Sequence, residues 1–171
     1  MGHRDPRESS APVPSAAGFR FAVIVSRFNE SITESLRAAA RQTLADAGAP
    51  DRAVDEYRVP GAFELPQAAR AVAETGRVDA VICLGCVIRG ETPHFEYISS
   101  AVAHGVMQAA GDTGLPVIFG VLTTDTPAQA EERAGQNPGN KGREAAIAAI
   151  EMAVLFRRLG VPPARADGSR A

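Results

Sequence analysis

The residues with the clearest potential for chemistry stand together between positions 89 and 94: Arg89, Gly90, Glu91, Thr92 and His94. They follow an apolar run at residues 80–88 that predicts a buried strand, and they lead into a helical pattern that begins near Pro93. In an open parallel sheet, ligands bind at such strand-to-helix junctions. The helix end offers unpaired N–H groups to an anion, Gly90 lets backbone approach a ligand, and His94 can move a proton near neutral pH.

Two earlier junctions of the same kind carry further candidates. A predicted strand at residues 19–26 ends in Arg-Phe-Asn at 27–29, and a more polar strand at residues 53–59 ends in Pro-Gly-Ala-Phe-Glu at 60–64. The carboxyl ends of parallel strands meet at one edge of a sheet, so the three junctions predict a pocket there. The chain has neither a G-x-G-x-x-G segment nor a phosphate-loop lysine motif, so a dinucleotide or nucleoside triphosphate is not expected.

Several of these residues also have a purely structural interpretation. Phe28 could anchor its helix in the core or stack its ring on a planar heterocycle. Glu64 could be a first-turn acid favoured by the helix dipole or an acceptor for polyol hydroxyls. Arg133 could be a solvated helix end or a phosphate clamp. Lys141, the only lysine of the chain, could be solvated in a Gly-rich loop or serve as the amine of a Schiff-base enzyme.

Hydrophobic periodicity predicts the elements that position these residues. A capping box at Ser31–Glu34 opens a helix that Gly48 ends, and a second box at Thr126–Gln129 opens a short helix that stops at Gly135. Other helices are expected at residues 65–75, from 93 to the glycines at 111 and 114, and at 143–159; the remaining strands are expected at 78–88 and 116–123. With right-handed crossovers, this order gives a three-layer α/β/α sandwich around a small parallel sheet of about four strands.

Length and composition fit a single α/β domain at residues 18–160, with a flexible arm at 1–17 and a loose tail at 161–171. The net charge of −2 gives no reason to expect nucleic acid or an anionic membrane as a partner. Residues 1–17 lack the apolar segment of a secretory signal, so a cytoplasmic protein is expected. The Ala-rich helices leave more apolar surface than about four strands can cover, which indicates an oligomer.

The cysteines and two of the histidines have plain interpretations. Cys83 and Cys86 are spaced as C-x-x-C, but they lie inside a strand-like apolar run and have no second pair, so we interpret them as small buried hydrophobes and not as a redox or metal site. His104 falls opposite the apolar stripe of its helix, whereas His94 falls at its edge. His3 and His104 are therefore expected at the surface.

Five segments in unbroken order, from about Phe21 to Leu155, resemble the 6,7-dimethyl-8-ribityllumazine synthase family. They are Ser-Arg-Phe-Asn at 26–29, Val-Pro-Gly-Ala-Phe-Glu-Leu-Pro at 59–66, the segment 84–97 around Arg-Gly-Glu-Thr-Pro-His, the strand at 116–123, and the segment 132–142 that ends in Asn-Lys-Gly. Cys86 stands where the family often has threonine, but the contact expected there is made by the backbone. The resemblance implies a flavodoxin-like α/β fold, the lumazine synthase fold.

The resemblance also implies a transferase that condenses 5-amino-6-(D-ribitylamino)uracil with 3,4-dihydroxy-2-butanone 4-phosphate, the penultimate step of riboflavin biosynthesis, with no metal or organic cofactor. By similarity, His94 is the acid/base. The ribitylaminouracil would contact Phe28, Ala62, Phe63, Glu64, Cys86, Val87, Ile88 and Phe119. The butanone phosphate would contact Glu91, Thr92, Arg133 and Lys141.

The family pattern implies a homopentamer, or an icosahedral shell built of pentamers, with active sites at subunit interfaces and with Phe119 supplied by a neighbouring subunit. Riboflavin synthase is a further partner that the resemblance suggests. Two alternatives remain open from the sequence. One is a shell-forming or flavin-binding family member with weak or no catalysis, and the other is a Schiff-base lyase that uses Lys141.

Overall fold

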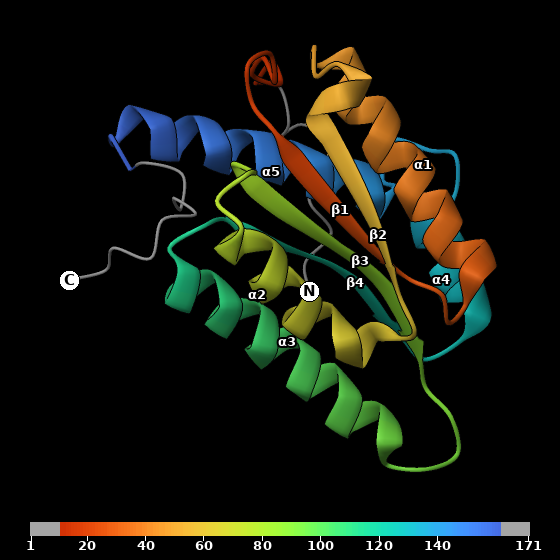
Figure 1. Cartoon of the computed structure of the whole chain (residues 1–171). Coiled ribbons are helices and arrows are strands. Elements are labelled where there is room, and N and C mark those ends of the chain that lie inside the picture. Colours follow the sequence, from red (N-terminus) through yellow and green to blue (C-terminus); the bar gives the residue numbers. More distant parts are fainter. Residues whose placement is uncertain (1–10, 162–171) are drawn as a thin grey trace.

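A four-stranded parallel sheet forms the centre of the computed structural model, which describes residues 11–161 (Figure 1). The strands are β1 (Phe21–Ser26), β2 (Val54–Val59), β3 (Ala80–Ile88) and β4 (Val117–Thr124), in the spatial order β2-β1-β3-β4. β1 is buried along its whole length, as an apolar central strand should be. β2, the more polar strand predicted at residues 53–59, lies at an edge of the sheet.

In residues 11–161, five helices cover the two faces of the sheet: α1 (Glu30–Asp46), α2 (Leu65–Glu74), α3 (His94–Thr113), α4 (Pro127–Ala134) and α5 (Lys141–Arg158). Single 3-10 turns, η1 (Asp51–Ala53) and η2 (Ala62–Glu64), precede β2 and α2. Helices α1, α4 and α5 share one hydrophobic cluster with the sheet, which contains Leu36, Leu84 and Ile150. Helices α2 and α3 share the other, which contains Leu65 and Val102. The three-layer α/β/α prediction is confirmed.

The start of α1 corrects one prediction. The helix begins at Glu30 and not after a Ser31–Glu34 capping box, because Asn29 takes a left-handed backbone conformation (φ 60°) and its carbonyl oxygen accepts the N–H groups of Ile32 and Thr33. Asparagine tolerates this conformation better than most residues do. Glu34 is therefore free to pair with Arg37 and Arg58 on the outer side of the helix. Thr126 is confirmed as the N-cap of the second predicted box, since its hydroxyl accepts the N–H of Gln129, but the Gln129 side chain accepts the N–H of Asp125 and not that of Thr126.

Helix α5 also begins earlier than predicted. The Asn140 side chain accepts the N–H groups of Gly142 and Arg143, so Lys141 is the first residue of the helix and does not belong to the preceding loop. At Gly142 the helix lies directly against the backbone of α1: a Cβ atom there would stand 2.0 Å from the carbonyl oxygen of Leu36. Only glycine allows two backbones to approach so closely.

Some expectations concern the ends of the chain. Ala16, placed in the predicted arm, is buried, and its N–H donates to the Ala47 carbonyl oxygen, so this part of the segment contacts the domain. Residues 1–10, including His3, and residues 162–171 lie outside the described residues. Within residues 11–161, no helix combines the length and apolar character needed to cross a membrane.

Candidate active site

The turn between β1 and α1 presents Phe28 to solvent. The Phe28 ring is 71% exposed, so the interpretation as a core anchor is wrong. The N–H of Phe28 donates to the Pro60 carbonyl oxygen (3.1 Å), which joins this turn to the β2–α2 turn. The next residue, Asn29, donates from Nδ2 to the Cys86 carbonyl oxygen at the end of β3 (3.0 Å). These two hydrogen bonds hold the carboxyl ends of β1, β2 and β3 at a common edge.

The turn between β2 and α2 contributes Gly61, Ala62 and Phe63. Ala62 is buried, whereas Phe63 is 58% exposed. The Glu64 carboxylate accepts the N–H of Gly61 (2.9 Å), so in this structure it caps its own turn. Beneath the turn, Gly85 of β3 leaves room for the Leu65 side chain, which a Cβ atom would meet at 2.9 Å.

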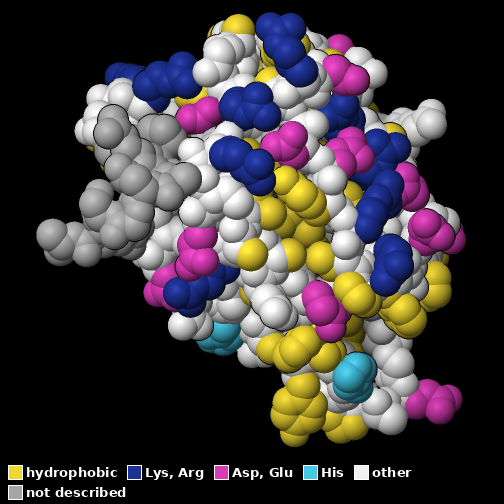
Figure 2. All heavy atoms as spheres, viewed as in Figure 1, with side chains coloured by type: hydrophobic (Ala, Val, Ile, Leu, Met, Phe, Trp, Pro, Cys, Tyr) yellow, Lys and Arg dark blue, Asp and Glu magenta, His cyan; other side chains and the backbone are white. Residues whose placement is uncertain are grey.

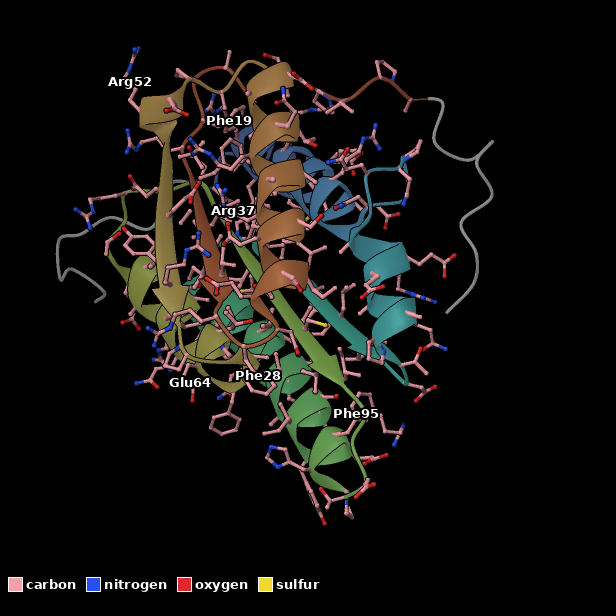
Figure 3. The ribbon with its side chains drawn as sticks, turned by 90° about the vertical axis from the view of Figure 1, so that its right-hand side faces the viewer. Phe19, Phe28, Arg37, Arg52, Glu64 and Phe95 are labelled. Carbon is pink, nitrogen blue, oxygen red and sulfur yellow. The ribbon has the colours of Figure 1, made fainter. Side chains whose placement is uncertain are left out.

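A cavity of about 400 Å³ lies where the three junctions meet. Phe28, Glu64 and Phe95 mark this end of the molecule, whereas Phe19 and Arg52 lie at the opposite end (Figure 3). In the view of Figure 1 this is the lower end of the molecule, and hydrophobic side chains gather there on the surface (Figure 2). The lining residues are Phe28, Gly61, Ala62, Phe63, Cys86, Val87, Ile88, Gly90, Thr92, His94, Phe95 and Ile98.

The cavity brings together most of the residues that we predicted for the heterocyclic substrate, with Thr92 and His94 at its helical side. Four lining residues were not assigned to either substrate: Gly61 and Gly90, which belong to the predicted junctions, and Phe95 and Ile98. The sequence pattern puts Phe95 and Ile98 on the apolar stripe of α3, where they do lie. The first turns of α3 project beyond the sheet (Figure 1), so this part of the stripe faces the cavity and not the core.

Five predicted site residues do not line this cavity: Glu64, Glu91, Phe119, Arg133 and Lys141. Phe119 lies within β4, paired with Cys83 of β3, and is 43% exposed. Arg133 lies near the end of α4, and its guanidinium donates to the Gln129 carbonyl oxygen (3.0 Å). Lys141 Nζ pairs with Glu144 Oε2 (2.8 Å). No lysine amine lines this cavity.

The cysteines behave as expected. Both are buried thiols without a disulfide, and burial raises the pKa of Cys83 to about 12 and that of Cys86 to about 11. Both thiols therefore stay protonated at neutral pH and are poor nucleophiles. The described part of the chain contains no group of three or more His, Cys, Asp or Glu side chains that could hold a metal ion.

Comparison with known proteins agrees with this geometry. Residues 18–157 match the family described as 6,7-dimethyl-8-ribityllumazine synthase. A protein of that name from Syntrophus aciditrophicus is 54% identical over 144 residues, which cover 84% of this chain and 94% of the relative. One from Salinibacter ruber is 56% identical over 142 residues, covering 83% and 91%. The match spans all strands and nearly all of the five helices, and the chain belongs to the 6,7-dimethyl-8-ribityllumazine synthase family.

Proposed function

We propose that this chain condenses 5-amino-6-(D-ribitylamino)uracil with 3,4-dihydroxy-2-butanone 4-phosphate to 6,7-dimethyl-8-ribityllumazine, with release of phosphate and water. The observation that carries the proposal is the cavity at the carboxyl edge of the sheet, which an exposed aromatic ring (Phe28) and a titratable imidazole (His94) both line. Its volume of about 400 Å³ suits a small organic molecule. An acid/base beside a planar binding surface is what imine formation followed by phosphate elimination requires.

Most of the lining residues have a role in this proposal. The Phe28 ring stacks on the pyrimidine, and the Ala62–Phe63 turn and the half-buried end of β3 hold the ring edge and the ribityl chain through their backbone groups. The phosphate lies at the N-terminus of α3 near Thr92, where unpaired N–H groups and the helix dipole favour an anion. His94, the first residue of α3, exchanges protons with the condensing amine and carbonyl.

The direct test is to incubate the purified chain with both substrates and to measure released inorganic phosphate together with the absorbance of the lumazine product. We expect both to rise at equal rates. Product formation no faster than in a protein-free control would contradict the enzymatic proposal and favour a binding or shell-forming role instead. Borohydride added during turnover should leave Lys141 unmodified, because the condensing amine belongs to the substrate.

The active site that we propose is shared between subunits of a ring. Phe119, Arg133 and Lys141 lie away from the cavity of their own chain, and we propose that they complete the cavity of the neighbouring chain. The assembly is then a homopentamer or a shell of pentamers, which sedimentation velocity distinguishes by size. It operates in the cytoplasm, and riboflavin synthase, which would act on the lumazine product, is a proposed partner.

Mixing two impaired variants, assayed below the KM for the phosphate substrate, tests the shared site. In rings co-refolded from equal amounts of His94→Ala and Arg133→Ala chains, about a quarter of the interfaces should receive both wild-type residues, because each interface combines two different chains. We expect the mixture to be more active than either variant alone. If each chain contains a whole site, every pocket still lacks one residue and the mixture only averages the two variants.

Phe28 and Arg133 should affect different substrates. Phe28→Ala removes the stacking surface and should raise the KM for the pyrimidine while sparing the phosphate substrate. Arg133→Ala should raise the KM for the phosphate substrate roughly tenfold and spare the pyrimidine. The reason is that it removes a charge-assisted contact of about 1.5 kcal/mol made by a half-exposed side chain. Steady-state kinetics with each substrate varied in turn measures both effects. If both variants weaken the same substrate, the assigned geometry is wrong.

A further inference from the structure

Arg89, the first residue after β3, connects three parts of the molecule. Its backbone N–H donates to the Thr124 carbonyl oxygen at the end of β4 (2.8 Å). Its guanidinium donates from Nε to Asp125 Oδ1 (2.7 Å) and from Nη1 to the Glu96 carboxylate in the first turn of α3. The same guanidinium lies over the Phe95 ring, 4.2 Å from its centroid. One side chain therefore joins the β3–α3 junction to the β4–α4 turn.

The junction that Arg89 spans needs such a connection. Residues 89–94 are all exposed, and Pro93, which precedes the first residue of α3, provides no side-chain cap. The first turns of the helix project beyond the sheet edge (Figure 1), where the sheet cannot support them. His94 belongs to this first turn, directly before the residue on which Arg89 stacks. The position of the His94 imidazole relative to the cavity thus depends on contacts that the residues before and after it in the sequence make.

Arg89 is poorly suited to bind the phosphate itself. It does not line the cavity, whereas Phe95 beneath it does. Its donors are directed at two carboxylates, and the hydrogen bonds that it donates, to Asp125 first and to Glu96 second, raise the pKa of Arg89. Two acidic side chains around one guanidinium leave the group without net positive charge for an incoming dianion. The neighbourhood therefore favours a structural link over an anion site.

We propose that Arg89 is a positioning residue for the condensation: by clamping Glu96 and Phe95 to Asp125 it holds the first turn of α3, and with it His94, at the cavity. The inference rests on the proposed function. Because exposed ion pairs contribute little to global stability, removal of Arg89 should change catalysis and the local mobility of residues 90–97 without unfolding the protein.

The test compares Arg89→Met with Arg70→Met. Arg70 is a matched control, since it is also exposed and also bridges two carboxylates, Glu74 and Asp112, but it lies between α2 and the far end of α3. For Arg89→Met we expect kcat to fall by roughly tenfold, within the ~10²-fold that a 1 Å misplacement of a reacting group can cost. The KM for the phosphate substrate should change little. Backbone amides of residues 90–97 should exchange with deuterium faster, and Arg70→Met should show none of these effects.

Two further measurements separate the alternatives. Asp125→Asn should lower kcat, as Arg89→Met does, because it removes the carboxylate that anchors the Arg89 guanidinium. If Arg89 were instead a phosphate ligand, freeing its guanidinium should strengthen inhibition by inorganic phosphate. Unchanged amide exchange at 90–97 in Arg89→Met, or a loss confined to the phosphate KM, would overturn the proposal. An inactive wild-type protein would overturn the proposed function alone, and the amide exchange would still decide whether Arg89 holds the junction.

Discussion

Replacing His94 with alanine is expected to lower turnover by about 10²-fold or somewhat less, at the low end of what general acid–base catalysis contributes. The effect is limited because an amine and a ketone condense slowly without help. Binding of both substrates should change little, since the contacts that we propose for the ring, the ribityl chain and the phosphate do not involve the imidazole. Single-turnover rates measured across the pH range would report the loss.

His104→Ala is the matched control for this variant. Both histidines are exposed residues of α3, but His104 does not line the cavity. Its ring makes a hydrogen bond from Nδ1 to the Ser100 carbonyl oxygen (2.8 Å). We expect this variant to keep wild-type turnover. If His94→Ala shows an unchanged rate at every pH, the acid/base role belongs to another group.

Gly142→Ala should destabilise the protein strongly, although it adds only one methyl group. The added Cβ would stand 2.0 Å from the Leu36 carbonyl oxygen and 2.7 Å from its carbonyl carbon, and both are backbone atoms that cannot rotate away. Helices α1 and α5 would have to separate, at a cost of about 3 kcal/mol or more. Urea denaturation at a fixed protein concentration would measure the loss, because the stability of the proposed oligomer would depend on concentration.

Gly111→Ala provides the comparison. Gly111 also lies within a helix, α3, but a Cβ atom there meets nothing within 4 Å. Alanine in a helix interior is better than glycine by about 0.5–1 kcal/mol, so this variant should be as stable as the wild type or slightly more so. A Gly142→Ala protein with wild-type urea sensitivity would mean that the backbones of α1 and α5 are not in direct contact at this position.

Much of the site could be predicted because its residues follow directly from strand ends. A buried strand that is followed by Phe28, or by the segment 89–94, places these residues at the carboxyl edge of the sheet, however the core packs. The exposure of Phe28 could not be predicted, since an aromatic residue at a turn fits a core as well as a stacking surface. Its exposure depends on the Pro60 and Cys86 hydrogen bonds around the turn, which join segments far apart in the sequence.

Other features depended on contacts that local pattern does not encode. The Ser31–Glu34 pattern is a good capping box, but the left-handed Asn29 starts the helix earlier, and Asn140 does the same for α5. The periodicity that puts Phe95 and Ile98 on the apolar stripe of α3 identified the right helical face but not where the sheet beneath it ends. The link from Arg89 to Asp125 spans 36 positions, and nothing in either local sequence predicts it.

The division of the core by the sheet has a consequence for how the chain acquires its structure during synthesis. The cluster under α2 and α3 draws its buried residues from positions 22–121, so it can close as soon as β4 has left the ribosome. The opposite cluster needs Ala145, Ala146, Ala149, Ile150 and Ala153, all from α5. Until α5 is translated, the part of this apolar face that α1 and α4 do not cover stays open to solvent, and the nascent protein passes through a partly covered stage in which it is most exposed to aggregation.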